Sequence, residues 1–199
     1  NKVAYTKKCL ETLYKNTQGD SFEVIIVDNA STDNTHDFLR QASQQYKDFC
    51  YIRNEENLRF AGACNQGARG ARGKYLIFLN NDTEPERGWL LEGIKRLTSS
   101  SDIGIVGVKL LYPDRTVQHC GIEFVRIINP DYAIWPIHRF RHTREDDPKV
   151  NVPEEVHAVT GACLFIDREF FKEVGQFSED YGMYFEDTDL CFKVRARGK

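Results

Sequence analysis

A short apolar segment that ends in polar residues restricts most strongly how this 199-residue chain can fold. Residues 75–79 read Tyr-Leu-Ile-Phe-Leu without interruption, and Asn80, Asn81, Asp82 and Thr83 follow them. An unbroken apolar run of this length is typical of a strand buried on both faces, as in a parallel sheet. Open α/β sheets bind ligands beyond the carboxyl ends of their strands, so we expect these polar side chains at a binding edge. Their oxygen atoms suit a hard divalent cation and the phosphates that it carries.

A second acidic cluster, residues 186–189, reads Glu-Asp-Thr-Asp. One of its carboxylates could remove a proton from a substrate, as a general base does. Crowding three carboxylates is expected to raise the pKa of at least one of them. Together the two polar clusters predict an enzyme that handles a metal-bound phosphate compound.

Composition removes several other classes of function. The apolar fraction of 41% and charged fraction of 29% are ordinary for a globular protein, and a net charge of -3 argues against a nucleic-acid partner. No apolar stretch approaches the ~18 residues of a membrane-spanning helix, and no signal peptide is visible. The six cysteines are scattered without a CxxC pair, which favours buried thiols over disulfides. The five histidines show no ligand spacing, so a zinc site is not expected.

Strands and helices alternate through the first half. Apolar periodicity predicts helices at residues 2–16 and 60–71, a helix around 89–97 that Pro85 opens, and strands at 22–27, 50–53 and 75–79. Another helix is expected after residue 33, with Phe38, Leu39, Ala42 and Tyr46 on one face. Asp33 or Thr32 can cap the helix that follows it. This rhythm predicts an α/β fold with a doubly wound, mainly parallel mixed sheet flanked by helices.

The second half has a different pattern. Residues 103–111 and 117–125 flank a Pro-Asp-Arg turn and are expected to pair as a hairpin or a mixed-sheet segment. Residues 126–153 predict a long loop, and its basic and aromatic part, 135–142, reads as a partly solvated segment or as a grip for the acceptor. Further along, we expect a strand at 156–167, a short helix at 168–174 and a final helix at 186–197.

Five short motifs occur in order along the chain. They are Val-Asp-Asn-Ala-Ser-Thr-Asp at 27–33, Asn57 with Phe60–Asn65 and Gly67, Leu-Asn-Asn-Asp-Thr at 79–83, Thr-Gly-Ala at 160–162, and Phe-Glu-Asp-x-Asp-Leu-x-x-Lys-x-Arg at 185–195. In this order the chain resembles the family 2 glycosyltransferases, which have the GT-A fold, and especially their rhamnosyltransferase-like members. The resemblance spans residues 1–199. It implies inverting transfer of a sugar from a nucleoside diphosphate donor to an acceptor hydroxyl.

The resemblance also implies roles for individual residues. Asp28 would bind the nucleoside together with Asn29 and Asp33, and the region of Asn65 and Gly67 would help to shape the nucleotide pocket. The donor would be a UDP-, dTDP- or GDP-linked sugar.

For the metal and the base, the same resemblance points to the two acidic clusters. Asp82 would bind Mg²⁺ or Mn²⁺ with the diphosphate, and Asn80 stands where relatives carry the first aspartate of this motif. Asp187 would be the general base, with Glu186 the less favoured candidate. Asp189 is better explained by an outward pair with Lys193, four residues on.

We expect one catalytic domain over 1–199, with a nucleotide-binding half at 1–100 and an acceptor-binding half at 101–199. Compared with relatives, the first strand and a C-terminal segment are missing, so the chain is expected to be truncated at both ends. The resemblance implies a polysaccharide, glycan or lipid-linked acceptor and a cytoplasmic location, with association with the inner face of a membrane left open.

Two other functions stay open from the sequence. Asn80 weakens the expected metal site and favours a non-catalytic module that binds nucleotide sugars within a larger protein. A sugar nucleotidyltransferase on a similar sheet is disfavoured, because such enzymes begin with a glycine-rich loop after their first strand. Taken alone, Asp82 also fits an ordinary turn and Asp33 an ordinary helix cap.

Overall fold

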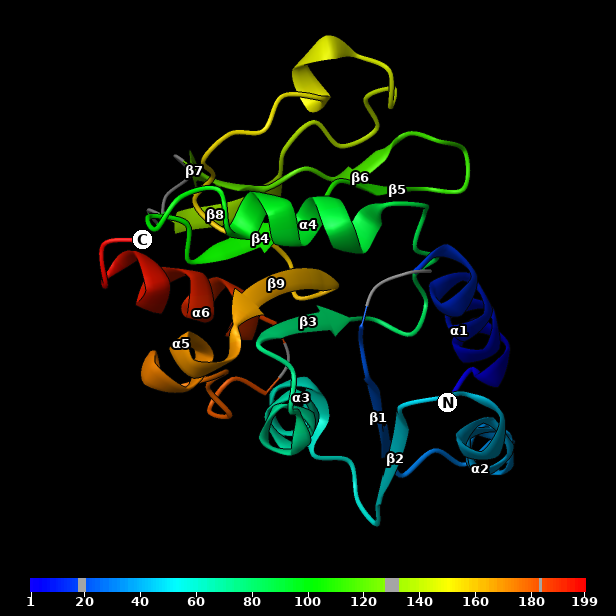
Figure 1. Ribbon diagram of the computed structural model, residues 1–199. Helices are drawn as coiled ribbons and strands as arrows, with labels where there is room; N and C mark the ends of the chain where they lie inside the picture. The colour runs from blue at the N-terminus through cyan, green and yellow to red at the C-terminus, as the bar shows by residue number, and fades with distance from the viewer. Residues whose placement is uncertain (18–20, 128–132, 183) are drawn as a thin grey trace.

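The computed structural model describes residues 1–17, 21–127, 133–182 and 184–199 (Figure 1). Two groups of strands lie side by side in this view, each with its own helices. One group is β1 and β2 beside α1 and α2, and the other is centred on β3 and β9. The mixed α/β architecture expected from the sequence is confirmed.

The first group contains the amino-terminal elements. These are α1 (Val3–Asn16), β1 (Val24–Asn29), α2 (Thr35–Gln45) and β2 (Phe49–Asn54). β1 and β2 pair in parallel, from Val24 opposite Phe49 to Asn29 opposite Asn54. Leu10, Leu39 and Ala42 are buried where the two helices cover these strands. β1 runs two residues beyond the predicted strand end, so Asp28 and Asn29 belong to the strand itself.

The second group begins with α3 (Arg59–Gly70), β3 (Tyr75–Leu79) and α4 (Trp89–Leu97). β3 is packed on both faces, as its unbroken apolar sequence predicted. Leu76 and Phe78 belong to the core cluster that also contains α3, α5 and α6 residues, whereas Ile77 and Leu79 pack towards α4. The prediction that Pro85 opens the next helix is wrong. That helix begins only after Gly88, whose φ of 78° breaks the helical path.

The remaining elements come from the second half of the chain. They are β4 (Ile105–Gly107), β5 (Leu110–Leu111), β6 (Val117–His119), β7 (Ile122–Ile127), β8 (Ala133–His138), a 3-10 helix (Pro148–Val150), β9 (Cys163–Asp167), α5 (Arg168–Glu173) and α6 (Glu186–Arg195). β9 lies between β3 and β4 and is antiparallel to both. This three-stranded sheet is therefore antiparallel throughout, and the parallel pairing expected for the strand at 75–79 is wrong; within the described residues, the strands that pair in parallel are β1 and β2.

Four predictions for the second half need correction. The strand expected at 117–125 is divided into β6, which pairs with β5, and β7, which pairs with β8. The strand expected at 103–111 is divided, because β4 joins β9 while β5 pairs with β6. Of the strand expected at 156–167, only Cys163–Asp167 is formed, as β9. The loop expected at 126–153 contains β8, which pairs with β7 in a hairpin from Ile122 opposite His138 to Ile127 opposite Ala133. Residues 128–132 of that predicted loop lie outside the described residues.

The centre of the molecule is β9, where Leu164, Phe165 and Ile166 are completely buried. α4 approaches this strand closely, because Gly93 faces the ring of Phe165. A Cβ built on Gly93 would lie 2.4 Å from the Cε1 and Cζ atoms of that ring. The close approach of α4 to the sheet therefore requires glycine at this position.

Two further properties follow from the elements. None of the helices in the described ranges is both long and apolar enough to cross a membrane. All six cysteines are free thiols, and Cys9, Cys163 and Cys191 are buried.

The packing of Gly93 leads to a stability prediction. Gly93→Ala should lower the free energy of unfolding by about 1–3 kcal/mol, because the added methyl group overpacks a buried ring. The matched control is Gly70→Ala in α3, where the nearest atom to the new Cβ is Ile25 Cδ1 at 4.0 Å. This control should be neutral or stabilising, since alanine favours helix over glycine by about 1 kcal/mol. Urea denaturation measures both, and equal losses would contradict the packing argument.

Candidate active site

The Thr-Gly-Ala segment that precedes β9 brings two of the sequence motifs together. The amide of Asn80 donates to the carbonyl oxygen of Ala162 at 2.9 Å, which places the turn after β3 beside this segment. The amide of Gly161 donates to Oδ2 of Asp187 at 2.8 Å, which places the start of α6 on its other side. The two acidic regions predicted from the sequence therefore lie on either side of one short segment.

Gly161 also brings in the motif at the start of α3. A Cβ at this position would lie 2.9 Å from Cζ of Phe60 and 3.5 Å from Cβ of Asp187. The residue before Phe60, Arg59, accepts through its carbonyl oxygen a hydrogen bond of 2.9 Å from Nδ2 of Asn29, at the end of β1. All five motifs are thus linked by direct contacts at the ends of β1 and β3.

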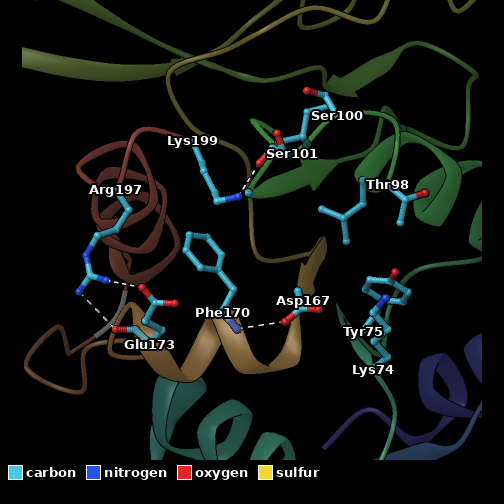
Figure 2. Close-up of a pocket in the computed structure, with 13 residues that line it drawn as sticks. Lys74, Tyr75, Thr98, Ser100, Ser101, Asp167, Phe170, Glu173, Arg197 and Lys199 are labelled. Carbon is cyan, nitrogen blue, oxygen red and sulfur yellow. Dashed lines mark hydrogen bonds and ion pairs between the residues drawn. The ribbon is translucent and has the colours of Figure 1, made fainter.

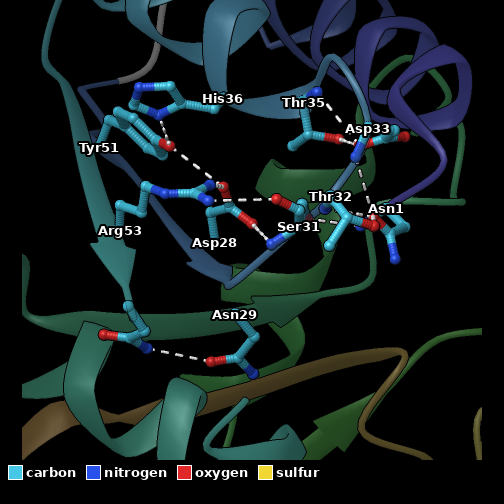
Figure 3. A network of polar contacts seen from close by, with 11 residues as sticks. Asn1, Asp28, Asn29, Ser31, Thr32, Asp33, Thr35, His36, Tyr51 and Arg53 are labelled. Atoms are coloured by element: carbon cyan, nitrogen blue, oxygen red, sulfur yellow. Dashed lines mark hydrogen bonds and ion pairs between the residues drawn. The ribbon is translucent and has the colours of Figure 1, made fainter. Parts of the chain in front are cut away.

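Asp28 is the centre of a polar network at the end of β1 (Figure 3). Its side chain is buried; Oδ1 accepts from the amide of Ser31 at 2.9 Å, and Oδ2 accepts from Arg53 Nη1 at 2.6 Å and from the Tyr51 hydroxyl at 3.1 Å. Burial by itself raises the pKa of Asp28, but the bonds from Ser31 and Tyr51 and the charge of Arg53 outweigh it. The pKa therefore lies below its ordinary value, and Asp28 is an anion at neutral pH.

The network continues to His36, whose Nδ1 lies 2.7 Å from the Tyr51 hydroxyl. A phenol has one proton, and Tyr51 donates it to Asp28. The proton in the contact with His36 must therefore belong to Nδ1 of the imidazole. A chain of donors from His36 through Tyr51 ends on the Asp28 carboxylate, as Figure 3 shows.

Asn29 and Asp33 lie on either side of this network. Asn29 Oδ1 accepts from Asn54 at 3.0 Å, so both ends of its amide are used. The carboxylate of Asp33 accepts from Thr35 and from the amide of Val3, and these bonds lower its pKa. Asp33 thus ties the start of α1 to the start of α2, but the prediction that Asp33 or Thr32 is the N-cap of α2 is wrong, because that position is Asn34.

Asn65 lies in a different environment from the other residues expected at the nucleotide. Its side chain is buried; Nδ2 donates to the carbonyl oxygen of Phe177 at 2.9 Å and to Glu179 at 3.0 Å, while Oδ1 accepts from the amide of Phe177 at 3.2 Å. These bonds fasten the segment before α6 to α3. Asn65 can shape the pocket through that segment, while its own polar atoms are already paired.

The turn after β3 offers oxygen atoms to solvent. Thr83 donates to the carbonyl oxygen of Asn80 at 2.7 Å and closes the turn. Asp82 is exposed, and its carboxylate forms no hydrogen bond or ion pair with the residues that the structure describes. In the same ranges, no group of three or more His, Cys, Asp and Glu side chains is placed to hold a metal ion. This donor set fits an Mg²⁺-like ion that takes one or two protein oxygens and completes its shell with phosphate and water.

The acidic residues at the start of α6 differ sharply from one another. Glu186 is buried, and burial followed by repulsion from Asp187 raises its pKa. Its Oε2 finds no hydrogen-bond partner among the described residues. Asp189 forms the predicted pair with Lys193 at 2.7 Å. Asp187 is partly exposed; its Oδ2 accepts from the amide of Gly161 at 2.8 Å and its Oδ1 from the amide of Thr188 at 2.7 Å.

Comparison with known proteins supports the family resemblance found in the sequence. Residues 1–175 match the model of the family described as glycosyl transferase family 2. The chain belongs to glycosyl transferase family 2. The O-antigen biosynthesis protein RfbC of Myxococcus xanthus is 30% identical to it over 199 residues, which cover 95% of this chain and 15% of RfbC.

More distant relatives agree with this assignment. An N-acetylglucosaminyl-diphospho-decaprenol L-rhamnosyltransferase of Mycobacterium tuberculosis is 25% identical over 191 residues, covering 88% of this chain and 61% of the relative. The structure of mannosyltransferase PcManGT from Pyrobaculum calidifontis, in complex with GDP-Man and Mn²⁺, matches with a TM-score of 0.71 at 22% identity. This match covers all of the chain and 50% of PcManGT, and it shows a GT-A glycosyltransferase fold. The chain spans about a fifth or less of the two curated relatives that are 30% identical to it.

Sequence reasoning missed one polar pair in this family 2 domain. His119 and His138 contact each other through their Nδ1 atoms at 2.8 Å. Residues 119 and 138 are nineteen positions apart, and no ligand spacing or periodicity connects them. Only the pairing of β7 with β8, which the sequence did not predict, brings them together.

A cavity of about 530 Å³ lies away from this site (Figure 2). Its lining includes Lys74 and Tyr75 at the beginning of β3, whereas Asn80 follows the end of that strand. Figure 2 shows Arg197 bonded to Glu173 and Lys199 to the carbonyl oxygen of Ser101. These two cations are already used, so the cavity does not present them to a ligand.

The Asp28 network leads to a second prediction. Asp28→Asn should lower the free energy of unfolding by about 1–3 kcal/mol at neutral pH, because Arg53 loses its charged partner. The lowered pKa means that this stabilisation is present above the unfolded-state value of about 3.9 and is lost as the pH falls further. Urea denaturation at several pH values should show the difference between the two proteins shrinking below about pH 4.

The matched control is Asp48→Asn, since Asp48 pairs with Lys47 at 3.9 Å on the surface. Asp48→Asn should change the free energy of unfolding by close to zero, because most exposed ion pairs contribute little to stability. A cost for Asp28→Asn no larger than that of the control would show that the network does not stabilise the strand end.

Proposed function

We propose that this domain transfers a sugar from a nucleoside diphosphate donor to an acceptor hydroxyl, with inversion at the anomeric carbon and with help from a divalent cation. The observation that carries the proposal is the position of the Thr-Gly-Ala segment. It contacts the turn that holds Asp82 through Ala162 and contacts Asp187 through Gly161. The turn that carries Asp82 and the carboxylate of Asp187 thus lie on either side of one short segment.

The end of β1 is assigned to the nucleoside. Asp28 holds Arg53 and the turn at Ser31, while Asn29 holds the backbone at Arg59. A nucleoside placed at this edge would meet a preorganised set of backbone and side-chain groups. The halves 1–100 and 101–199 would then supply the donor side and the acceptor side respectively.

The turn after β3 is assigned to the diphosphate and its cation. Asp82, with the amide oxygen of Asn80, would hold Mg²⁺ or Mn²⁺. When bound, such a cation neutralises the negative charge that develops on the departing diphosphate. The weak protein contribution to its shell suits a cation that enters together with the nucleotide.

Asp187 is assigned as the general base. Its carboxylate is partly exposed, and the Gly161 amide fixes its orientation. A hydroxyl is a poor nucleophile, and a positioned base contributes roughly two to four orders of magnitude to its reaction. Direct displacement by the activated hydroxyl inverts the anomeric carbon and needs no covalent intermediate. Glu186 is the weaker candidate because it is buried, and an acceptor cannot reach its carboxylate.

The identity of the substrates rests on the relatives. PcManGT was solved with GDP-Man and Mn²⁺, and GalNAc-T7 with UDP, GalNAc and Mn²⁺, so a UDP-, dTDP- or GDP-linked sugar is the proposed donor. The names of RfbC and of the rhamnosyltransferase refer to an O-antigen and to a diphospho-decaprenol. A polysaccharide or lipid-linked acceptor in the cell envelope, used from the cytoplasmic side, is therefore the proposed partner.

The first test addresses the base. Asp187→Asn should lower transfer by roughly a hundredfold to ten-thousandfold, because the amide cannot take a proton, and should leave donor affinity nearly unchanged. Transfer is measured by product formation and affinity by calorimetry. The control is Asp189→Asn on the same helix, whose partner is Lys193, and it should keep transfer close to that of the wild type. Normal turnover in Asp187→Asn would remove this residue from the mechanism.

The second test addresses the cation and the alternative function. UDP, dTDP and GDP are titrated into the protein with and without Mn²⁺; we expect one nucleotide to bind in a metal-dependent manner. Asp82→Asn should abolish the metal-dependent part, whereas Glu84→Gln on the same turn should not. Metal-dependent affinity that Asp82→Asn leaves unchanged would contradict the role of Asp82. Nucleotide-sugar binding without any turnover would favour a non-catalytic module, to which Asn80 in the metal motif lends some support.

A further inference from the structure

The pair His119 and His138 lies beside the proposed base and is not used by the mechanism above. His119 is buried on β6 with 1% of its surface exposed. Its Nε2 accepts from the amide of Gly121 at 3.3 Å and from that of Thr160 at 3.4 Å. A ring nitrogen that accepts from an amide carries no proton, so the proton of neutral His119 is on Nδ1.

This tautomer determines that of the second ring. The Nδ1 atoms of His119 and His138 are 2.8 Å apart, so His119 donates and His138 accepts. The proton of His138 is therefore on Nε2, which forms no hydrogen bond with any residue of the described ranges. Burial lowers the pKa of His119 to about 3, and burial followed by the charge of Arg141 lowers that of His138. Both rings are thus neutral at neutral pH.

Consecutive backbone amides connect this pair to the base. The amide of Thr160 binds His119, and the next amide, that of Gly161, binds Asp187. The carboxylate of Asp187 is close enough to act on the pKa of His138, which it raises against the effects of burial and of Arg141. An exposed imidazole with a free N–H therefore lies near the partly exposed carboxylate of Asp187.

The end of β8 that carries His138 is held firmly. Ile122, opposite His138, donates to the carbonyl oxygen of Ala158 at 2.8 Å, which joins the hairpin to the residues just before the Thr-Gly-Ala segment. Arg139 forms ion pairs at 2.7 Å with Glu123 and with Glu154. Its charge is balanced there, so it is not offered to a phosphate group.

We propose that His138 is a positioning residue for the acceptor sugar, which donates from Nε2 to a hydroxyl oxygen next to the one that Asp187 deprotonates. The proposal rests on the function proposed above. A fixed donor beside a fixed carboxylate matches two adjacent hydroxyls of a neutral sugar. His119 holds the tautomer that makes this donor available.

The test compares transfer with hydrolysis, because water needs no second hydroxyl contact. The acceptor probes are methyl α-D-mannopyranoside and methyl β-D-glucopyranoside, used with the donor that corresponds to the nucleotide found by calorimetry. The measured quantity is the ratio of glycoside product to free sugar. His138→Phe should lower this ratio about tenfold, the effect of one lost hydrogen bond.

His138→Gln should restore most of the ratio, since its amide can both accept from His119 and donate outward. The control is His142→Phe, which keeps a ring on Tyr112 and lies on the same segment without touching His119; its ratio should equal that of the wild type. His138 is exposed, so these variants are expected to fold, and thermal melting checks this.

Nitrogen-15 NMR of the wild type tests the geometry independently of turnover. At pH 7, His138 should show a protonated Nε2 and an unprotonated Nδ1. A charged ring or the opposite tautomer would overturn the proposal. An unchanged ratio in His138→Phe would also overturn the proposal for His138. So would a wild type that hydrolyses the donor but transfers to neither glycoside. Both results leave the proposed transferase function intact. Absence of both nucleotide binding and turnover would instead overturn that function.

Discussion

The arrangement of the site depends on one hydrogen bond, from the amide of Gly161 to Asp187. It can form only because residue 161 has no side chain, since any Cβ would press against the ring of Phe60 at 2.9 Å. The residues on either side extend the same contact, because Thr160 binds His119 and Ala162 binds the backbone of Asn80. Three consecutive residues thereby connect Asp187, the histidine pair and the turn that carries Asp82.

α3 joins the two groups of strands on which the site is built. On one side, Gly67 lies over β1, where a Cβ would make an ordinary van der Waals contact with Val27 Cγ2 at 3.5 Å. On the other side, Ala61 and Ala68 are buried in the core beneath β3 and β9. α3 therefore contacts both groups of strands through small residues.

Predictions from the sequence were correct where an element depends on residues near it in the chain, and failed where it depends on distant ones. α1, α2, α3, β1, β2 and β3 were predicted because each carries its own periodicity or apolar run. β8 was missed because Pro136 and the scattered polar residues read as loop, and proline is tolerated there only because β8 is an edge strand of a two-stranded hairpin. The strand expected at 103–111 was divided for a similar reason, since its partners β9 and β6 come much later in the chain.

The sequence by itself determined the family, the α/β class and the set of polar residues at the strand ends, because these are properties of local order and residue type. Only the tertiary structure decided what each carboxylate faces. Neighbours on a helix point about 100° apart, so the packing of α6 against the core buries Glu186 and leaves Asp187 accessible. The same holds for His119 and His138, whose contact exists only through the pairing of distant strands.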